Sequence, residues 1–261
     1  MKNLIYQFWN GDVPYYAKRS SSMMKSYADY VGAEYRVDYN SSYVKSGSPE
    51  YMNCFRPIHD ASFHEYDNVL FLDMDIFPVE NIKDNIFELN HTGIALAQEI
   101  GMTDIRYSNT GRISGQADEK WAKILKDAYD IMLPRDDKNR LMVYNSGVVL
   151  YSQQGLIEAQ KSFIPINEYQ SKMRGLDRFY SLDQNYLHAM LFTGTVNFTE
   201  LDTKWNSQIY YNGQGNPRPI KDNRTDKTQF VHLQLRGRNT LTDEKIYDIV
   251  NLPIHSWRHR K

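Results

Sequence analysis

The sequence has little of what marks several large classes of protein. Among its 261 residues there is a single cysteine, Cys54, which excludes an internal disulfide framework and suggests a reducing compartment. No apolar run approaches the ~20 residues that a membrane-spanning helix needs. The formal net charge of -1, with 24% charged residues, gives no support to binding of nucleic acid or of a membrane surface as the main activity. The length allows one large domain or two small ones.

The most informative segment runs from Val69 to Pro78. Four apolar residues lead directly into Asp73-Met74-Asp75, and two more apolar residues and the proline follow. A continuous apolar run predicts a strand buried on both faces, as in an α/β sheet, and ligands bind at the carboxyl ends of such strands. Burying two neighbouring carboxylates is costly without a cation or a proton. Because alternate residues of an extended segment face the same side, Asp73 and Asp75 are predicted to hold one Mg²⁺ or Mn²⁺ ion on a diphosphate. Two solvated turn aspartates are the alternative.

The first 75 residues alternate between expected strands and helices. The strands are expected at 1–9, 34–38 and 68–72, with helices at 15–31 and 51–65 between them. This alternation is typical of parallel strands joined by right-handed crossovers. The elements expected further along are strands at 93–98, 141–144, 147–151, 195–201 and 229–233 and helices at 118–131, 156–169, 182–192 and 243–250. No linker divides the chain, so one α/β domain spanning 1–261 is predicted.

Three later segments follow the order and spacing of a known family. They are Tyr144 to Leu150 (Tyr-Asn-Ser-Gly-Val-Val-Leu), Ser181 to Asn185 and Phe230 to His232. With the strand that ends in Asp-X-Asp, they resemble the GT-A fold of nucleotide-sugar glycosyltransferases, most of all family 8, the glycogenin- and galactosyltransferase-like enzymes. The resemblance implies a mixed, Rossmann-like sheet flanked by helices. It also implies a nucleotide-binding half at 1–98 and a sugar- and acceptor-binding half at 99–261.

The resemblance assigns roles to residues in these segments. In family 8 a histidine of the last strand is the third metal ligand, so His232 is expected to join Asp73 and Asp75 on Mn²⁺ or Mg²⁺. A core histidine bonded to the backbone is the alternative. The residues expected to orient the donor sugar and to carry the catalysis are Asn145, Asp183 and Gln184, with Ser146 beside them.

Further contacts are expected from the end of the first strand and from the loops. An aromatic ring at the end of the first strand can stack on the nucleobase, although such a ring can equally well pack in the core. The donor-binding residues expected are Phe8, Trp9, Asn10, Arg56, Asp73, Ser146, Arg236 and Arg238. The arginines are expected to bind the diphosphate, because guanidinium binds phosphate bidentately and the Lys-Pro-Trp ending of family 8 is missing here. For Arg56 a surface role is the alternative. The acceptor-binding residues expected are Trp205, Asn206 and Tyr210.

These roles imply transfer of a sugar from a nucleoside-diphosphate sugar, a UDP-sugar before others, to a hydroxyl group of a glycan or glycolipid. Retention is the favoured outcome, with the leaving phosphate taking the acceptor proton; inversion would need a carboxylate base, for which Asp183 is the candidate. The segment Tyr6 to Gly11 is closer to capsular and outer-chain sugar transferases, and Asn185 replaces an aspartate of family 8. Residues 1–9 do not fit a signal peptide, and a cytoplasmic enzyme of bacterial or viral type is expected.

Two other classes remain open at the level of sequence. A phosphatase of the haloacid dehalogenase type also places Asp-X-Asp after an apolar strand, but that motif usually opens the domain and is followed by Gly-Thr or Gly-Val. Here Ile76-Phe77 follows, two strands are expected before it, and no later Gly-Asp-X-X-X-Asp occurs. A non-catalytic sugar- or nucleotide-binding module would be expected to lack a metal ligand, whereas Asp73, Asp75 and His232 are all present.

Overall fold

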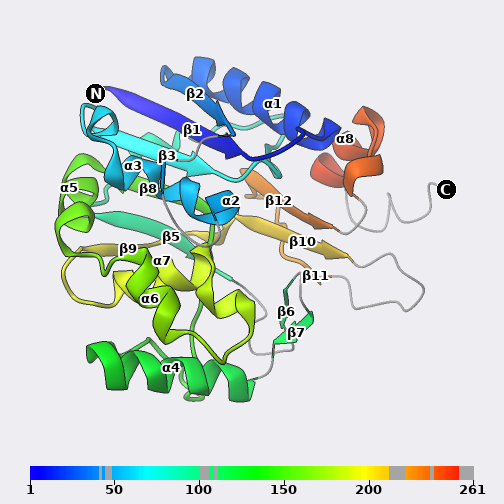
Figure 1. Ribbon diagram of the computed structural model, residues 1–261. Coiled ribbons are helices and arrows are strands. Elements are labelled where there is room, and N and C mark those ends of the chain that lie inside the picture. Colours follow the sequence, from blue (N-terminus) through cyan, green and yellow to red (C-terminus); the bar gives the residue numbers. More distant parts are fainter. Residues whose placement is uncertain are drawn as a thin grey trace.

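A six-stranded mixed sheet with the order β2-β1-β3-β8-β5-β9 forms the centre of the protein (Figure 1). The computed structural model describes residues 1–40, 43–44, 49–99, 106–108, 111–113, 115–211, 221–235 and 238–252. In sheet order the strands are Glu34–Tyr39, Asn3–Trp9, Asn68–Leu72, Tyr144–Ser152, Ile94–Gln98 and Phe198–Leu201. β1 is parallel to β2 and β3, β8 is antiparallel to β3 and β5, and β9 is parallel to β5. The expected α/β fold with a mixed sheet is confirmed.

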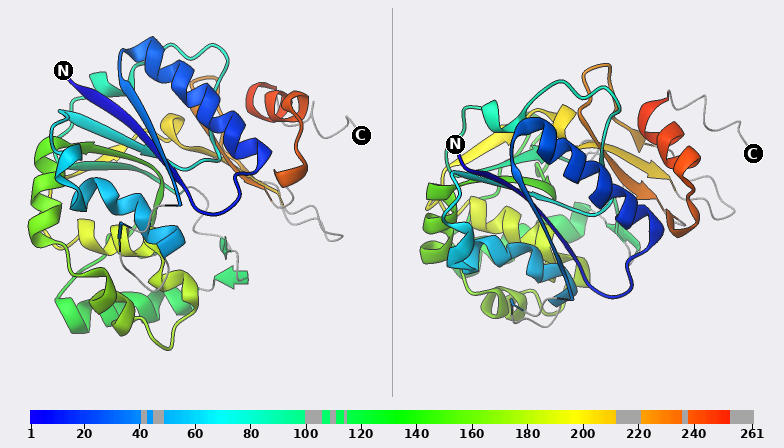
Figure 2. Two further views of the ribbon diagram at one scale, coloured as in Figure 1. Left: turned by 45° about the horizontal axis from the view of Figure 1, so that its top comes forward. Right: turned by 90° about the horizontal axis from the view of Figure 1, so that it is seen from above.

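Helices cover both faces of this sheet (Figures 1 and 2). Successive strand residues point to opposite faces, so Leu4 and Ile5 of β1 belong to different cores. Ile5 lies in the core beneath α1 (Tyr15–Val31), which includes Met24 and Tyr27. The core on the other face is covered by α2 (Pro49–Met52), α3 (Arg56–His59), α4 (Gly115–Tyr129), α5 (Gln153–Ser162), α6 (Ile166–Lys172) and α7 (Asp183–Leu191).

A second, smaller sheet adjoins the first and has the order β11-β10-β12-β4. Its strands in that order are Lys221–Asp222, Ser207–Tyr211, Phe230–Leu235 and Ile76–Pro78. β12 is parallel to β10 and antiparallel to β4. The last helix, α8 (Asp243–Asn251), packs its apolar face in a core shared with α1 and this sheet. β6 (Arg106–Ser108) and β7 (Gly111–Ile113) form a separate hairpin.

The two sheets meet at the Asp73-Met74-Asp75 segment. β3 ends in the large sheet at Leu72, and β4 begins in the small sheet at Ile76. Only Asp73, Met74 and Asp75 separate the two strands, so the Asp-X-Asp triplet is the turn that connects the sheets. β8, from the expected second half of the chain, lies between β3 and β5 of the first half, so those halves interleave in the sheet.

Several expected helices differ from those observed, and proline explains the clearest cases. The single helix expected at 51–65 is wrong: α2, η1 (Asn53–Phe55), α3 and η2 (Ala61–Phe63) replace it. Pro57 cannot donate a backbone hydrogen bond there, and the Asp60 side chain caps a new turn by accepting from the Ser62 N–H at 3.0 Å. The helix expected at 156–169 is divided into α5 and α6 at Pro165, because the residue before proline is pushed out of the helical region.

Residues 144–152 form one continuous strand, β8, so the break expected between the strands at 141–144 and 147–151 is wrong, and only Tyr144 of the first expected strand belongs to β8. Asn145 and Ser146 resemble turn residues by type, yet both are buried strand residues. Their side chains find partners inside the protein, which a composition-based assignment of a loop does not anticipate.

Candidate functional site

The Asp73–Asp75 turn is held by backbone and buried side-chain contacts. The Asp73 N–H donates to the Gly147 carbonyl at 2.9 Å, and the Ile76 N–H donates to the Asp73 carbonyl at 3.1 Å. From beneath, Gln7 Nε2 donates to the Asp73 carbonyl at 3.2 Å and the Ser20 hydroxyl donates to the Ile76 carbonyl at 2.6 Å. These bonds come from β1, α1 and β8, and from within the turn, so three elements hold the backbone that carries the two carboxylates.

His232 reaches the same place from β12. Its register partner in β4 is Ile76, the residue directly after Asp75. The His232 Nε2 atom lies 3.2 Å from Asp75 Oδ1. One ligand atom from each of Asp73, Asp75 and His232 can be chosen so that all three lie within 4.8 Å of one another. The structure thus brings together the three residues that the sequence predicted as ligands.

The chemistry of this group fits a divalent metal ion. Asp75 is 8% exposed and His232 is 3% exposed, so little water is available to solvate the carboxylate. Carboxylate oxygens suit Mg²⁺ and Mn²⁺, whereas imidazole nitrogen suits transition metals, and a mixed set favours Mn²⁺ over Mg²⁺. Among the residues that the structure describes, no other group of three or more His, Cys, Asp or Glu side chains has its ligand atoms close enough together to hold a metal ion.

A second polar cluster lies at the start of β8 and of α7. The Ser146 hydroxyl donates to Asp183 Oδ2 at 2.9 Å, and Asn145 Nδ2 donates to Gln184 Oε1 at 3.2 Å. Burial raises the pKa of the Asp183 carboxyl, and the Ser146 hydroxyl opposes this rise in part. All four residues predicted to orient a sugar therefore lie together.

Gly147 allows the two clusters to approach one another. A Cβ atom at this position would lie 2.6 Å from His232 Cε1 and 2.9 Å from Asn145 Oδ1. Any larger side chain would have to displace the imidazole or the amide. The glycine of the Asn-Ser-Gly segment is thus required by close packing against a metal-ligand candidate.

Asn206 connects the clusters, although the sequence placed it with an acceptor. Its Nδ2 donates to Asn145 Oδ1 at 2.9 Å, and its Oδ1 lies 3.1 Å from His232 Nδ1. Asn206 is 2% exposed and its neighbour Trp205 is 1% exposed. The Trp205 ring packs edge-on against Phe230 with centroids 5.2 Å apart. The structure therefore places both residues inside the protein and not on an acceptor-facing surface.

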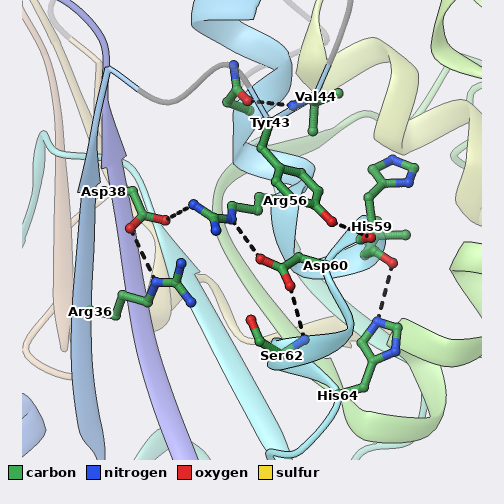
Figure 3. A network of polar contacts seen from close by, with 11 residues as sticks. Arg36, Asp38, Tyr43, Val44, Arg56, His59, Asp60, Ser62 and His64 are labelled. Carbon is green, nitrogen blue, oxygen red and sulfur yellow. Dashed lines mark hydrogen bonds and ion pairs between the residues drawn. The ribbon is translucent and has the colours of Figure 1, made fainter.

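Arg56 is engaged in a charged network at the end of β2 (Figure 3). Its Nη1 donates to Asp38 Oδ2 and its Nε donates to Asp60 Oδ2, each at 2.9 Å. Arg36 shares Asp38 through a 3.2 Å contact, and the Tyr43 ring lies 4.8 Å from the Arg56 guanidinium carbon. A phosphate would have to compete with two carboxylates for Arg56, so the network favours a structural role, which differs both from the expected diphosphate contact and from the surface role given as its alternative.

The other predicted donor residues differ in placement. Phe8 is 8% exposed and lies in a core. Trp9 donates its ring N–H to the Asp12 carbonyl at 3.0 Å, while Asn10 is exposed just beyond β1. Arg236 lies outside the described residues, and Arg238 and Tyr210 are described through their backbone, in η6 (Arg238–Thr240) and β10.

Sequence reasoning missed Glu99, Gln7 and Ser20. Glu99 follows β5, and its Oε2 accepts from Gln184 Nε2 at 2.6 Å. Its position after an expected strand at 93–98 was the available signal: β5 and β3 are both antiparallel to β8, so their carboxyl ends lie at the same edge of the sheet. Gln7 and Ser20 had no comparable signal, since a polar residue inside a buried strand or helix gains meaning only from its partners.

No described helix combines the length and the apolar character needed to cross a bilayer.

No protein-family model matches the chain, and no curated protein matches it significantly. Among solved structures, 138 chains match it significantly, including the two that follow. A glycosyltransferase involved in glycosylation of the major capsid of PBCV-1 has 13% identity and a TM-score of 0.48, with 89% of this chain and 92% of that chain covered. Mouse xyloside xylosyltransferase 1, in its apo form, has 12% identity and a TM-score of 0.49, with 93% and 100% covered. At these identities and scores the similarities do not assign an activity to the chain.

Proposed function

We propose that this protein is a metal-dependent glycosyltransferase that moves a sugar from a nucleoside-diphosphate sugar, a UDP-sugar before others, to a hydroxyl group of a glycan or glycolipid. One observation carries the proposal: Asn206 forms a hydrogen bond to Asn145 on one side and to His232 of the Asp73–Asp75–His232 group on the other. A metal site suits a diphosphate, and a neighbouring cluster of amides and a carboxylate suits sugar hydroxyls. The substrate class that needs both side by side is a nucleotide sugar.

Asp73, Asp75 and His232 would hold the metal ion, Mn²⁺ or Mg²⁺, which when bound supplies positive charge to the departing diphosphate. Two of these residues come from the turn between the sheets and one from β12, so the ligand set is assembled by tertiary packing. Arg236 and Arg238, just after β12, remain our candidates for binding phosphate oxygens.

The sugar is oriented by the cluster at the start of β8 and α7. Asp183 accepts a hydrogen bond from a sugar hydroxyl, as it does from Ser146 here, and Gln184 and Asn145 offer both donors and acceptors. We propose retention of configuration, with the leaving phosphate taking the acceptor proton. If the enzyme inverts, the raised pKa of Asp183 makes it the base that receives this proton.

The test uses donor breakdown, which needs no knowledge of the acceptor. Wild-type protein is incubated with a panel of sugar nucleotides and Mn²⁺, and release of the nucleoside diphosphate is measured. We expect release with at least one donor, loss of release with excess chelator, and loss in Asp75→Asn. The matched control is Asp127→Asn, which changes an exposed aspartate on α4 that pairs with Lys123. Equal release by Asp75→Asn, or release of inorganic phosphate from simple phosphate esters, would overturn the proposal in favour of another class.

A further inference from the structure

A continuous line of hydrogen bonds joins the end of β5 to the metal-ligand group. Each step is a hydrogen bond between side chains. The steps are Glu99 Oε2 to Gln184 Nε2 at 2.6 Å, Gln184 Oε1 to Asn145 Nδ2 at 3.2 Å, Asn145 Oδ1 to Asn206 Nδ2 at 2.9 Å, and Asn206 Oδ1 to His232 Nδ1 at 3.1 Å. Beyond this line, His232 Nε2 faces Asp75 Oδ1 at 3.2 Å.

The direction of every bond in this line is set by the Gly147 backbone. Its N–H lies 2.9 Å from Asn145 Oδ1, and a backbone N–H can only donate. The Asn145 atom facing it must therefore be the carbonyl oxygen. The same oxygen faces Asn206, so Asn206 must present its NH₂ group there and its own oxygen to His232.

The opposite end of the line requires the same directions independently. The Glu99 carboxylate can only accept, so Gln184 presents its NH₂ group to Glu99 and its oxygen to Asn145. Asn145 must then present its NH₂ group to Gln184, which leaves its oxygen for Gly147 and Asn206. Two fixed ends, a backbone donor and a carboxylate acceptor, thus agree on one orientation for all three amides.

The consequence falls on the imidazole. Because Asn206 presents an acceptor, His232 Nδ1 carries a proton, and the lone pair of neutral imidazole is left on Nε2, which faces Asp75. In the neutral ring, this lone pair and the Asp75 carboxylate oxygen lie 3.2 Å apart, as two atoms that can both bind one cation. The line of amides therefore prepares Nε2 to be a ligand.

We propose that Asn206 and Glu99 are positioning residues: through the line of amides they fix the His232 tautomer that binds metal and couple the metal group to the sugar-orienting residues. The inference rests on the proposed function and adds to it how the two clusters act together. Asn145, Asn206 and His232 are 2%, 2% and 3% exposed, so water cannot easily replace a lost partner.

The experiment measures Mn²⁺ binding directly, by the electron paramagnetic resonance signal of free Mn²⁺, and so does not depend on activity. We expect Asn206→Ala to weaken Mn²⁺ binding by about 10- to 100-fold, as is typical when a partner of a metal-ligating histidine is removed. Glu99→Ala is expected to weaken binding in the same direction. Glu99→Gln is expected to restore it, because its amide oxygen still accepts from Gln184.

The matched control is Asn68→Ala. Asn68 is also a buried asparagine, donates one side-chain hydrogen bond to Asn3 at 2.9 Å, and lies at the opposite end of β3 from Asp73. This variant should lose stability and keep wild-type Mn²⁺ binding. Wild-type binding in Asn206→Ala, or equal weakening in Asn68→Ala, would overturn the positioning role alone. If the wild type does not bind Mn²⁺, or if Asp75→Asn binds it as strongly as the wild type does, both the proposed function and this role are overturned.

Discussion

Adding a single methyl group at Gly147 should weaken the metal site without substituting any of the ligand residues. The new Cβ would lie 2.6 Å from His232 Cε1, whereas an ordinary contact begins at 3.4 Å, so the ring or the strand must move by 0.8 Å, the difference of the two. The 3.1 Å bond between His232 Nδ1 and Asn206 restrains that movement of the ring. Overpacking of this kind costs about 1–3 kcal/mol of folding free energy.

The assay pairs urea denaturation with Mn²⁺ binding. Gly147→Ala should lose stability in that range and bind Mn²⁺ at least about tenfold more weakly, because a displacement of 0.8 Å exceeds the tolerance of a metal ligand. The control is Gly155→Ala, whose Cβ would lie 2.2 Å from the Gly93 carbonyl oxygen at the other end of β8. That variant should lose stability and keep its Mn²⁺ affinity. Unchanged Mn²⁺ affinity in a destabilised Gly147→Ala would refute the role of His232 as a ligand.

Three further predictions concern residues around the site. Burial raises the folded-state pKa of Asp183, so ionisation of its carboxyl lowers stability as the pH rises through the interval between its unfolded and folded values. Asp183→Asn should therefore lose donor breakdown. In urea titrations it should be more stable than the wild type at pH 7, and this advantage should disappear at a pH below the unfolded-state pKa of Asp183. Arg56→Ala should cost ~1–2 kcal/mol, because Asp38 and Asp60 lose a shared partner, while nucleotide affinity measured by calorimetry stays unchanged; a large affinity loss would return Arg56 to the donor site. Trp205→Ala should cost about 3–5 kcal/mol in denaturant titrations, as for a core residue, and a normal stability with weakened acceptor use would contradict its placement.

The sequence was informative where one strong local signal had one structural meaning. The apolar run before Asp73 predicted a buried strand ending in paired carboxylates, and β3 has that form. The helix predictions failed at two prolines, because Pro57 and Pro165 interrupt segments whose apolar spacing is continuous. Periodicity averages over a window and is insensitive to one residue that lacks an N–H.

The candidate site shows the same limit. Asp73 and Asp75 were predictable from residue type and position after a strand, because those features are local, whereas His232 was expected only from the resemblance to family 8. The roles of Asn206 and Glu99 were not, since each depends on a partner more than 25 positions away along the chain. Trp205 was expected to bind the acceptor from its place in the sequence, and only its burial and its packing against Phe230 identify it as a core residue.

The central claim is that Asp73, Asp75 and His232 hold a metal ion on which a nucleoside diphosphate binds. Calorimetric titration of UDP into the wild-type protein, with Mn²⁺ and then with excess chelator, tests it most directly. The account predicts binding with Mn²⁺, at least about tenfold weaker binding with chelator, and equally weak binding in Asp75→Asn under both conditions. Binding of equal strength in the presence and absence of metal, or in Asp75→Asn and wild type, would contradict it.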